Sequence, residues 1–183
     1  MRRGQMMFMV TLSSLSSLGV GLLGPIYPIF VLNRFSASIF DVGMLLTIFG
    51  LASAIFKAPA GKMVDIYGKE RVFLIGVILG AFCSLAYIFA FNIIYLYLIE
   101  LFFGISNALQ DPARLALIME LGDKRKRGWI IGISESAYDV AGSIAAIIAA
   151  LIASNFGFES VFFTCSGCHV ATGLIILRSK RST

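Results

Sequence analysis

Residues 72–99 read VFLIGVILGAFCSLAYIFAFNIIYLYLI, a run of 28 residues without a charged side chain. A helix needs about 20 apolar residues to cross the hydrocarbon core of a bilayer. One span cannot absorb this run, because the apolar character continues to about Met119. Asn92 is the strongest helix breaker within it, so we predict two membrane-spanning helices, over 72–90 and 93–117.

The rest of the chain has the same apolar character. Its 183 residues are 58% hydrophobic and only 14% charged, with a mean hydropathy of +0.91, whereas soluble domains are about 25% charged. Further apolar stretches predict helices over 6–32, 41–60, 129–153 and 158–177. We therefore expect an all-α fold, a single six-helix membrane bundle over 1–183. This composition excludes a sizeable soluble domain and a secreted disulfide scaffold. The net charge of +5 therefore indicates membrane topology and not a nucleic-acid partner.

The basic residues predict the orientation of these six spans. Short loops rich in Lys and Arg stay in the cytoplasm. Of the 15 Lys and Arg residues, only Arg34 lies on the opposite side if the spans alternate. We therefore expect a multi-pass protein of the cell (cytoplasmic) membrane with both termini cytoplasmic. The triplet formed by the first three spans then starts inside and the triplet formed by the last three starts outside, which is the layout of 3+3 inverted repeats in transporters.

The connection over 61–71, GKMVDIYGKER, is predicted to be a loop, because it is polar and its glycines allow a tight reversal. It resembles the signature that the major facilitator superfamily carries between its second and third spans, Gly-x-x-x-Asp-(Arg/Lys)-x-Gly-(Arg/Lys)-(Arg/Lys). Gly61, Asp65, Gly68 and Lys69 match, Arg71 lies one place late, and Ile66 and Glu70 depart from it. The resemblance implies a gate loop that acts as a conformational latch. The alternative is a loop that only sets the topology.

The first predicted span carries a second resemblance. Leu18-Gly19, followed by Pro25-Ile26-Tyr27-Pro28, is similar to the Leu-Gly-x5-Pro-x-x-Pro pattern of the drug:proton antiporter branch of the same superfamily. Proline frees backbone carbonyls, which only a protein interior or a wet cavity tolerates within a membrane. Small residues also share one face of this helix: Ser13, Ser17, Gly21, Gly24 and Pro28. This face indicates either close packing or a substrate cavity, and Tyr27 is a candidate pathway residue.

The fourth predicted span carries three further pathway candidates, Glu100, Asn107 and Gln110. Glu100 stands where the family often has an arginine, so the charge is reversed. Asp111 and Arg114 follow three residues apart, and we expect them to neutralise each other as a pair at the helix end.

The fifth predicted span contains an acid pair, Glu135 and Asp139, four residues apart, with Tyr138 beside it. A carboxylate within the bilayer is costly unless it is paired, protonated or in contact with water. Asp139 and Glu135 are therefore candidate proton carriers, and Tyr138 a candidate pathway residue. The alternative is a neutral acid that is hydrogen-bonded to a neighbouring helix.

Two seams of small residues lie on the second and fifth spans. Ala141-x3-Ala145-Ala146-x2-Ala149-Ala150 resembles the antiporter signature Gly-x3-Gly-Pro-x2-Gly-Gly with alanine at every defined place, which keeps the seam and removes the kink. The other seam consists of Gly43, Thr47, Gly50, Ala54, Ala58 and Gly61. In the family these two helices face the opposite six-helix half.

The sixth predicted span contains Cys165-Ser-Gly-Cys168-His169, formally the C-x-x-C-H pattern of covalent haem attachment. Its place in mid-membrane argues against haem, so we expect thiols packed as small apolar groups and His169 bonded to a neighbour. The sequence shows no phosphate loop and no metal-spaced set of ligands. It also has no nucleophile–base pair outside the membrane. We expect no enzyme activity, no cofactor and no metal.

Together these resemblances imply the N-terminal half of a twelve-helix secondary transporter. In such proteins the substrate site lies between two halves that rock against each other. The expected function is proton-coupled export of small organic compounds by alternating access. The expected partners are the lipid bilayer, a small-molecule substrate and a second half, which is either a homodimer mate or a separately encoded C-terminal half. The alternative is a truncated or non-transporting membrane subunit that needs a partner half.

Overall fold

The computed structural model describes residues 3–121 and 126–180, and these contain helices and no β-strand. In chain order the helices are α1 (Arg3–Gly21), α2 (Ile26–Phe35), α3 (Ile39–Tyr67), α4 (Lys69–Ala86), the short 3₁₀ helix η1 (Tyr87–Phe89), α5 (Ile93–Leu121), α6 (Arg127–Phe156) and α7 (Phe158–Lys180). They make six apolar spans of membrane length, with α1–α2 and α4–η1 each counting as one. This confirms the predicted all-α membrane bundle and the break between its third and fourth spans.

The first span is two helices rather than the single helix predicted over 6–32. α1 ends at Gly21, residues 22–25 form a turn, and α2 begins at Ile26. Pro25 is the N-cap of α2 and Pro28 lies in its first turn, where a missing N–H costs no intrahelical hydrogen bond. The prolines therefore start a second helix instead of kinking the first.

The prediction of a loop over 61–71 is wrong, because α3 continues to Tyr67. Val64 is buried in a cluster with Ala60, so packing holds this polar segment in the helix. Only Gly68 leaves the helical conformation, with φ at +88°, a region that favours glycine. Its N–H donates to the Val64 carbonyl at 3.0 Å, and α4 begins at the next residue. A single residue therefore connects the second and third spans.

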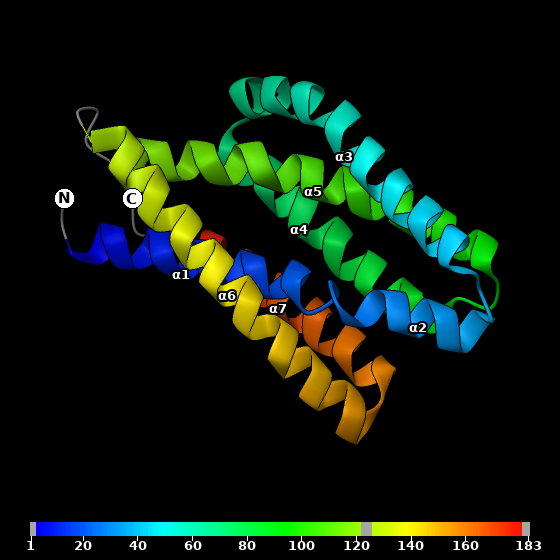
Figure 1. Ribbon diagram of the computed structural model, residues 1–183. Helices are drawn as coiled ribbons and strands as arrows, with labels where there is room; N and C mark the ends of the chain where they lie inside the picture. The colour runs from blue at the N-terminus through cyan, green and yellow to red at the C-terminus, as the bar shows by residue number, and fades with distance from the viewer. Residues whose placement is uncertain (1–2, 122–125, 181–183) are drawn as a thin grey trace.

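The spans form two groups. α5 packs against α3 and α4, α1 packs against α6 and α7, and contact between α4 and α7 joins the groups. The start of α1, the end of α5 and the end of α7 lie at one end of the bundle (Figure 1). Within an apolar segment of 18 residues taken from each span, only 22% is buried in α3 and 17% in α6, against 44–50% in the other four spans. α3 and α6 therefore each keep a wide free face.

Glycines allow the closest approaches between helices. A Cβ atom added at Gly104 of α5 would lie 2.5 Å from the Phe49 carbonyl oxygen and 2.8 Å from the Ala52 Cβ, both in α3. A Cβ atom at Gly21 of α1 would lie 2.9 Å from the Gly142 Cα in α6. Each group is thus held together by backbones that touch.

Gly104→Ala should lower the free energy of unfolding by about 1–3 kcal/mol, because the added methyl group forces α3 and α5 apart. Thermal unfolding of the purified protein in detergent measures this. Gly132→Ala is the matched control, since its added Cβ meets nothing within 4 Å and both changes bring the same gain in helix propensity. Equal stability of the two variants would contradict the packing described here.

Candidate functional site

Polar side chains inside the bundle gather in two clusters along α5. Glu100 lies at the centre of the first and Arg114 at the centre of the second. The two residues are about 21 Å apart along the helix, at 1.5 Å per residue. The clusters therefore occupy different depths of the membrane.

The Glu100 cluster is buried between the two groups of helices. Glu100 is only 3% exposed, and its Oε1 accepts a hydrogen bond of 2.8 Å from the Tyr87 hydroxyl. The buried Tyr27 hydroxyl lies beside the same carboxyl but makes no well-formed hydrogen bond. The rings of Tyr27 and Tyr87 are 5.2 Å apart. A carboxyl and two phenols from α5, η1 and α2 thus meet at one point.

A cavity of about 90 Å³ opens at this point, lined by Tyr27, Tyr87 and Glu100 together with Gly24 and Phe103. Sites for drug-sized ligands measure about 300–1,000 Å³, whereas one water needs only about 10–15 Å³. The cavity can hold a few waters or a very small polar molecule. A larger substrate needs space outside this cavity.

The Arg114 cluster ties three helices together. The Arg114 Nη1 donates to the Glu135 Oε1 at 2.9 Å and to the Ser13 Oγ at 3.4 Å, and its guanidinium carbon lies 4.4 Å from the centre of the Tyr138 ring. The hydroxyls of Ser13 and Ser134 are 2.6 Å apart. Because a buried arginine stays charged, it needs such partners. The cluster holds α1, α5 and α6 together.

The predicted pair of Asp111 and Arg114 does not form. Asp111 Oδ2 lies 2.7 Å from Lys57 Nζ of α3, and Arg114 pairs with Glu135 of α6. An ion pair within α5 would leave Lys57 and Glu135 without counter-charges in the membrane, which is costly. Two bridges between helices satisfy all four charges.

The acid pair of α6 is divided between two environments. Glu135 is bound to Arg114, whereas Asp139 is exposed on the free face of the helix. Among the described residues Asp139 has no ion-pair partner. It lies about 18 Å along α6 from Arg127, at 1.5 Å per residue. It belongs to a stripe of exposed small or polar residues: Gly132, Ser136, Asp139, Ser143 and Ala150.

Most of the predicted alanine seam of α6 does not lie on this free face. Ala141, Ala145 and Ala149 are buried, and the Ala145 Cβ is one of the atoms that Gly21 of α1 approaches, whereas Ala150 is exposed. The buried part of the seam therefore packs within this chain. Of the small residues in the first span, Ser13 and Gly21 pack against α6, while Gly24, in the turn after α1, lines the cavity at Glu100.

The seam of α3 is open along its length. A Cβ atom added at Gly43, Gly50 or Gly61 would meet nothing within 4 Å, and Thr47, Ala54 and Ala58 are exposed. The residues of the predicted gate lie beyond it, at the end of α3. Asp65 is exposed without an ion-pair partner in the part of the chain that the structure describes, while Lys69 pairs with Glu120 of α5.

Asn107 and Gln110 hold α5 to its neighbours. The Asn107 Nδ2 donates to the Ser53 Oγ of α3 at 3.1 Å. The Gln110 Nε2 donates to the Ser106 Oγ at 2.9 Å, and the Gln110 side chain packs against Gly76 of α4. These contacts give both residues a packing role, and Gln110 faces away from the cavity.

The C-x-x-C-H segment is part of the core. His169 is packed between Gly19 and Gly80, and its ring nitrogens have no hydrogen-bond partner among the described residues, so the expected bond to a neighbour is absent. The Cys165 thiol donates to the Gly19 carbonyl at 2.6 Å. No group of three potential metal ligands occurs within 3–121 and 126–180.

Tyr87, Ser134 and Lys57, the partners of Glu100, Ser13 and Asp111, were not singled out from the sequence. Lys57 could have been found, because each basic residue inside a span requires an acid within reach. Tyr87 could not, since no sequence spacing relates the end of the third span to Glu100 across the break.

Six apolar spans with charges paired inside them define a multi-pass α-helical membrane protein. Residues 9–182 match the family model of the Major Facilitator Superfamily. The chain belongs to this family of membrane transporters.

Curated relatives extend well beyond the matched region. The chain is 27% identical over 158 residues to an uncharacterized MFS-type transporter of Methanocaldococcus jannaschii, which covers 86% of the chain and 41% of the relative. It is 29% identical over 149 residues to the tetracenomycin C resistance and export protein of Streptomyces glaucescens, with 80% and 28% covered. It is 28% identical over 180 residues to the class B tetracycline resistance protein of Escherichia coli, with 95% and 43% covered. The chain thus spans less than half the length of each.

Arg114→Met should lower the free energy of unfolding by about 1–3 kcal/mol, which is below the range for a fully buried pair because the Glu135 side chain is 40% exposed. The double variant Arg114→Met/Glu135→Leu should recover part of the loss, since no unpaired charge remains. Unfolding in detergent measures both. Arg34→Met is the control, because the Arg34–Glu159 pair is exposed. Equal losses from Arg114→Met and Arg34→Met would contradict a structural role for the Arg114 cluster.

Proposed function

We propose that this chain is one half of a proton-coupled exporter of small organic compounds that works by alternating access. The observation that carries the proposal is Asp139, a carboxyl within a span of membrane length on the free face of α6, without an ion-pair partner among the described residues. A carboxylate that faced lipid at this depth would cost about 2.5–3.5 kcal/mol or more. A second half across a water-filled cleft removes this cost and leaves the carboxyl able to bind and release a proton.

The free faces of α3 and α6 are suited to contact with a second half. Both helices are poorly buried within the chain, and both carry stripes of small residues that allow another helix to approach closely. A second copy related by an axis along the membrane normal would set α3 of one chain against α6 of the other. A separately encoded C-terminal half would present equivalent surfaces. The greater length of the relatives is consistent with either arrangement.

The substrate site belongs between the halves, because the cavity at Glu100 is too small for a drug-sized molecule. Compounds of the class that resistance and export proteins carry are the proposed substrates, by analogy with two of the relatives. Tyr27 and Glu100 would contact small polar groups or water at the edge of this site. The proposal includes no enzymatic step.

The orientation and the gate follow from the charges. We place both termini and Gly68 on the cytoplasmic side of the cell membrane, where the basic residues concentrate. Gly68 is then a one-residue hinge between α3 and α4. Asp65, exposed one turn before this hinge, is available to helix ends of the second half. Opening and closing at this point would change which side of the membrane reaches the cleft.

Asp139→Asn should abolish pH-driven export of tetracycline or a cationic dye from proteoliposomes, because the amide cannot carry a proton. Exchange of substrate without a pH gradient should persist, since the substrate site is kept. Fluorescence of the trapped compound measures both. Glu159→Gln is the matched control, as it makes the same chemical change in an exposed ion pair and should leave gradient-driven export intact.

Unchanged gradient-driven export by Asp139→Asn would reject the role of this carboxyl. A wild-type chain that is monomeric in the bilayer and transports nothing would favour the other function considered, a membrane subunit without transport activity.

A further inference from the structure

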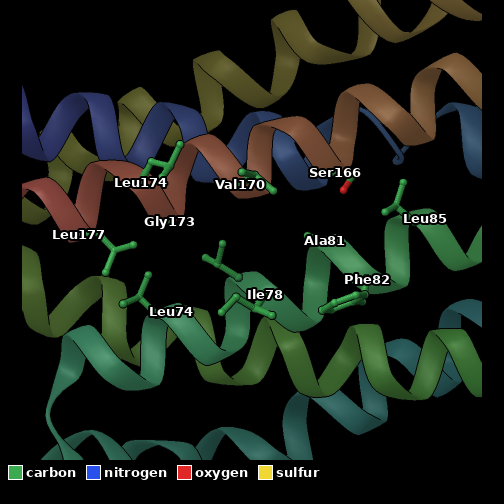
Figure 2. Close-up of a pocket in the computed structure, with 11 residues that line it drawn as sticks. Leu74, Ile78, Ala81, Phe82, Leu85, Ser166, Val170, Gly173, Leu174 and Leu177 are labelled. Carbon is green, nitrogen blue, oxygen red and sulfur yellow. The ribbon is translucent and has the colours of Figure 1, made fainter.

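An apolar groove of about 320 Å³ runs between α4 and α7. Figure 2 shows Leu74, Ile78 and Phe82 of α4 opposite Val170 and Leu174 of α7. Apart from Ser166 at one end, every lining residue is apolar or glycine. The groove is separate from the cavity at Glu100 and from the free faces of α3 and α6.

The groove has the depth of one bilayer leaflet. It extends from Leu74 to Leu85 on α4 and from Leu177 to Ser166 on α7, about 16 Å along each helix. The hydrocarbon core is about 30 Å thick, so each leaflet contributes about 15 Å. A transmembrane helix about 10 Å across would fill about 1,250 Å³ over the same length, about four times the groove. A single hydrocarbon chain is the occupant that matches this volume and length.

One end of the groove is positively charged. Arg71 precedes Leu74 by one turn on the same side of α4, and Arg178 directly follows Leu177 on α7. Both side chains are exposed, and neither is in an ion pair within the described residues. Lys69 nearby is already paired with Glu120. Arg71 and Arg178 therefore stand next to the end of the groove that Leu74 and Leu177 line, where a lipid headgroup would be if its chain entered the groove.

We propose that this groove binds an anionic phospholipid, with one acyl chain between α4 and α7 and the phosphate headgroup at Arg71 and Arg178. Guanidinium groups bind phosphate through paired, charge-assisted hydrogen bonds. Basic residues at the ends of membrane helices attract anionic lipids in the same way. The lipid would fill the space between the two groups of helices on the side where α4 packs against α7.

The test places a tryptophan in the groove. Trp129→Phe removes the only native tryptophan, and Phe82→Trp then reports on the groove, with Ile78→Trp as a second reporter if the first variant folds poorly. Quenching by brominated phosphatidylglycerol and brominated phosphatidylcholine in proteoliposomes gives the relative affinity of the two lipids. Phe102→Trp on an exposed face of α5 is the matched reporter outside the groove.

The groove reporter should prefer phosphatidylglycerol by about fivefold or more, the size expected from a neighbouring arginine, while Phe102→Trp shows nearly equal affinities. Arg71→Gln/Arg178→Gln should abolish the preference, and Lys62→Gln, the same change elsewhere, should not. Gly173→Leu should also reduce it, because a side chain there fits against Val77 and Leu74 and fills the groove. Equal affinities at the groove reporter, or a preference that survives the double arginine change, would mean ordinary boundary lipid and overturn the proposal.

Discussion

A charge inside a bilayer must find a counter-charge, a hydrogen-bond partner, a proton or water, and this constraint orders the interior of the protein. Arg114 meets it with Glu135, and Lys57 meets it with Asp111. Glu100 meets it in part through Tyr87. Each solution joins different helices, so the polar residues position the spans that apolar packing alone would leave free to slide. Asp139 is the carboxyl of α6 that has no ion-pair partner in the described part of the chain. A partner or water for it would have to come from outside these residues.

Composition and span length were enough to predict the six-span fold, because apolar runs of this length have few alternatives. The boundaries were harder to predict. Polar residues after Gly61 suggest a loop, yet a helix continues through polar residues as long as one side stays packed, as Val64 shows. Only Gly68 needs a backbone conformation that ends the helix. The sequence identifies that glycine but does not distinguish it from Gly61.

The candidate site was predicted as a set of residues but not as an arrangement. Spacing along one helix suggested the pair of Asp111 and Arg114, whereas their actual partners come from α3 and α6. Pairing between helices depends on which faces meet, and one sequence does not contain that information. The same is true of the alanine seam of α6, most of which packs inward, so that the free face carries a stripe that includes Asp139.

The central claim is that the free faces of α3 and α6 meet a second half across a cleft. Crosslinking in native membranes tests it most directly, using Gly50→Cys and Ser143→Cys in a chain whose Cys83, Cys165 and Cys168 are replaced by serine. Gly50 lies about 16 Å from the start of α3, and Ser143 lies about 20 Å from the end of α6. These two helix ends are on the same side of the bundle, so the two cysteines lie at similar depths. The account predicts a short crosslink to a second copy or to another membrane polypeptide. Cysteines that form no crosslink and react only with bilayer-soluble reagents would show that lipid covers these faces, and would contradict it.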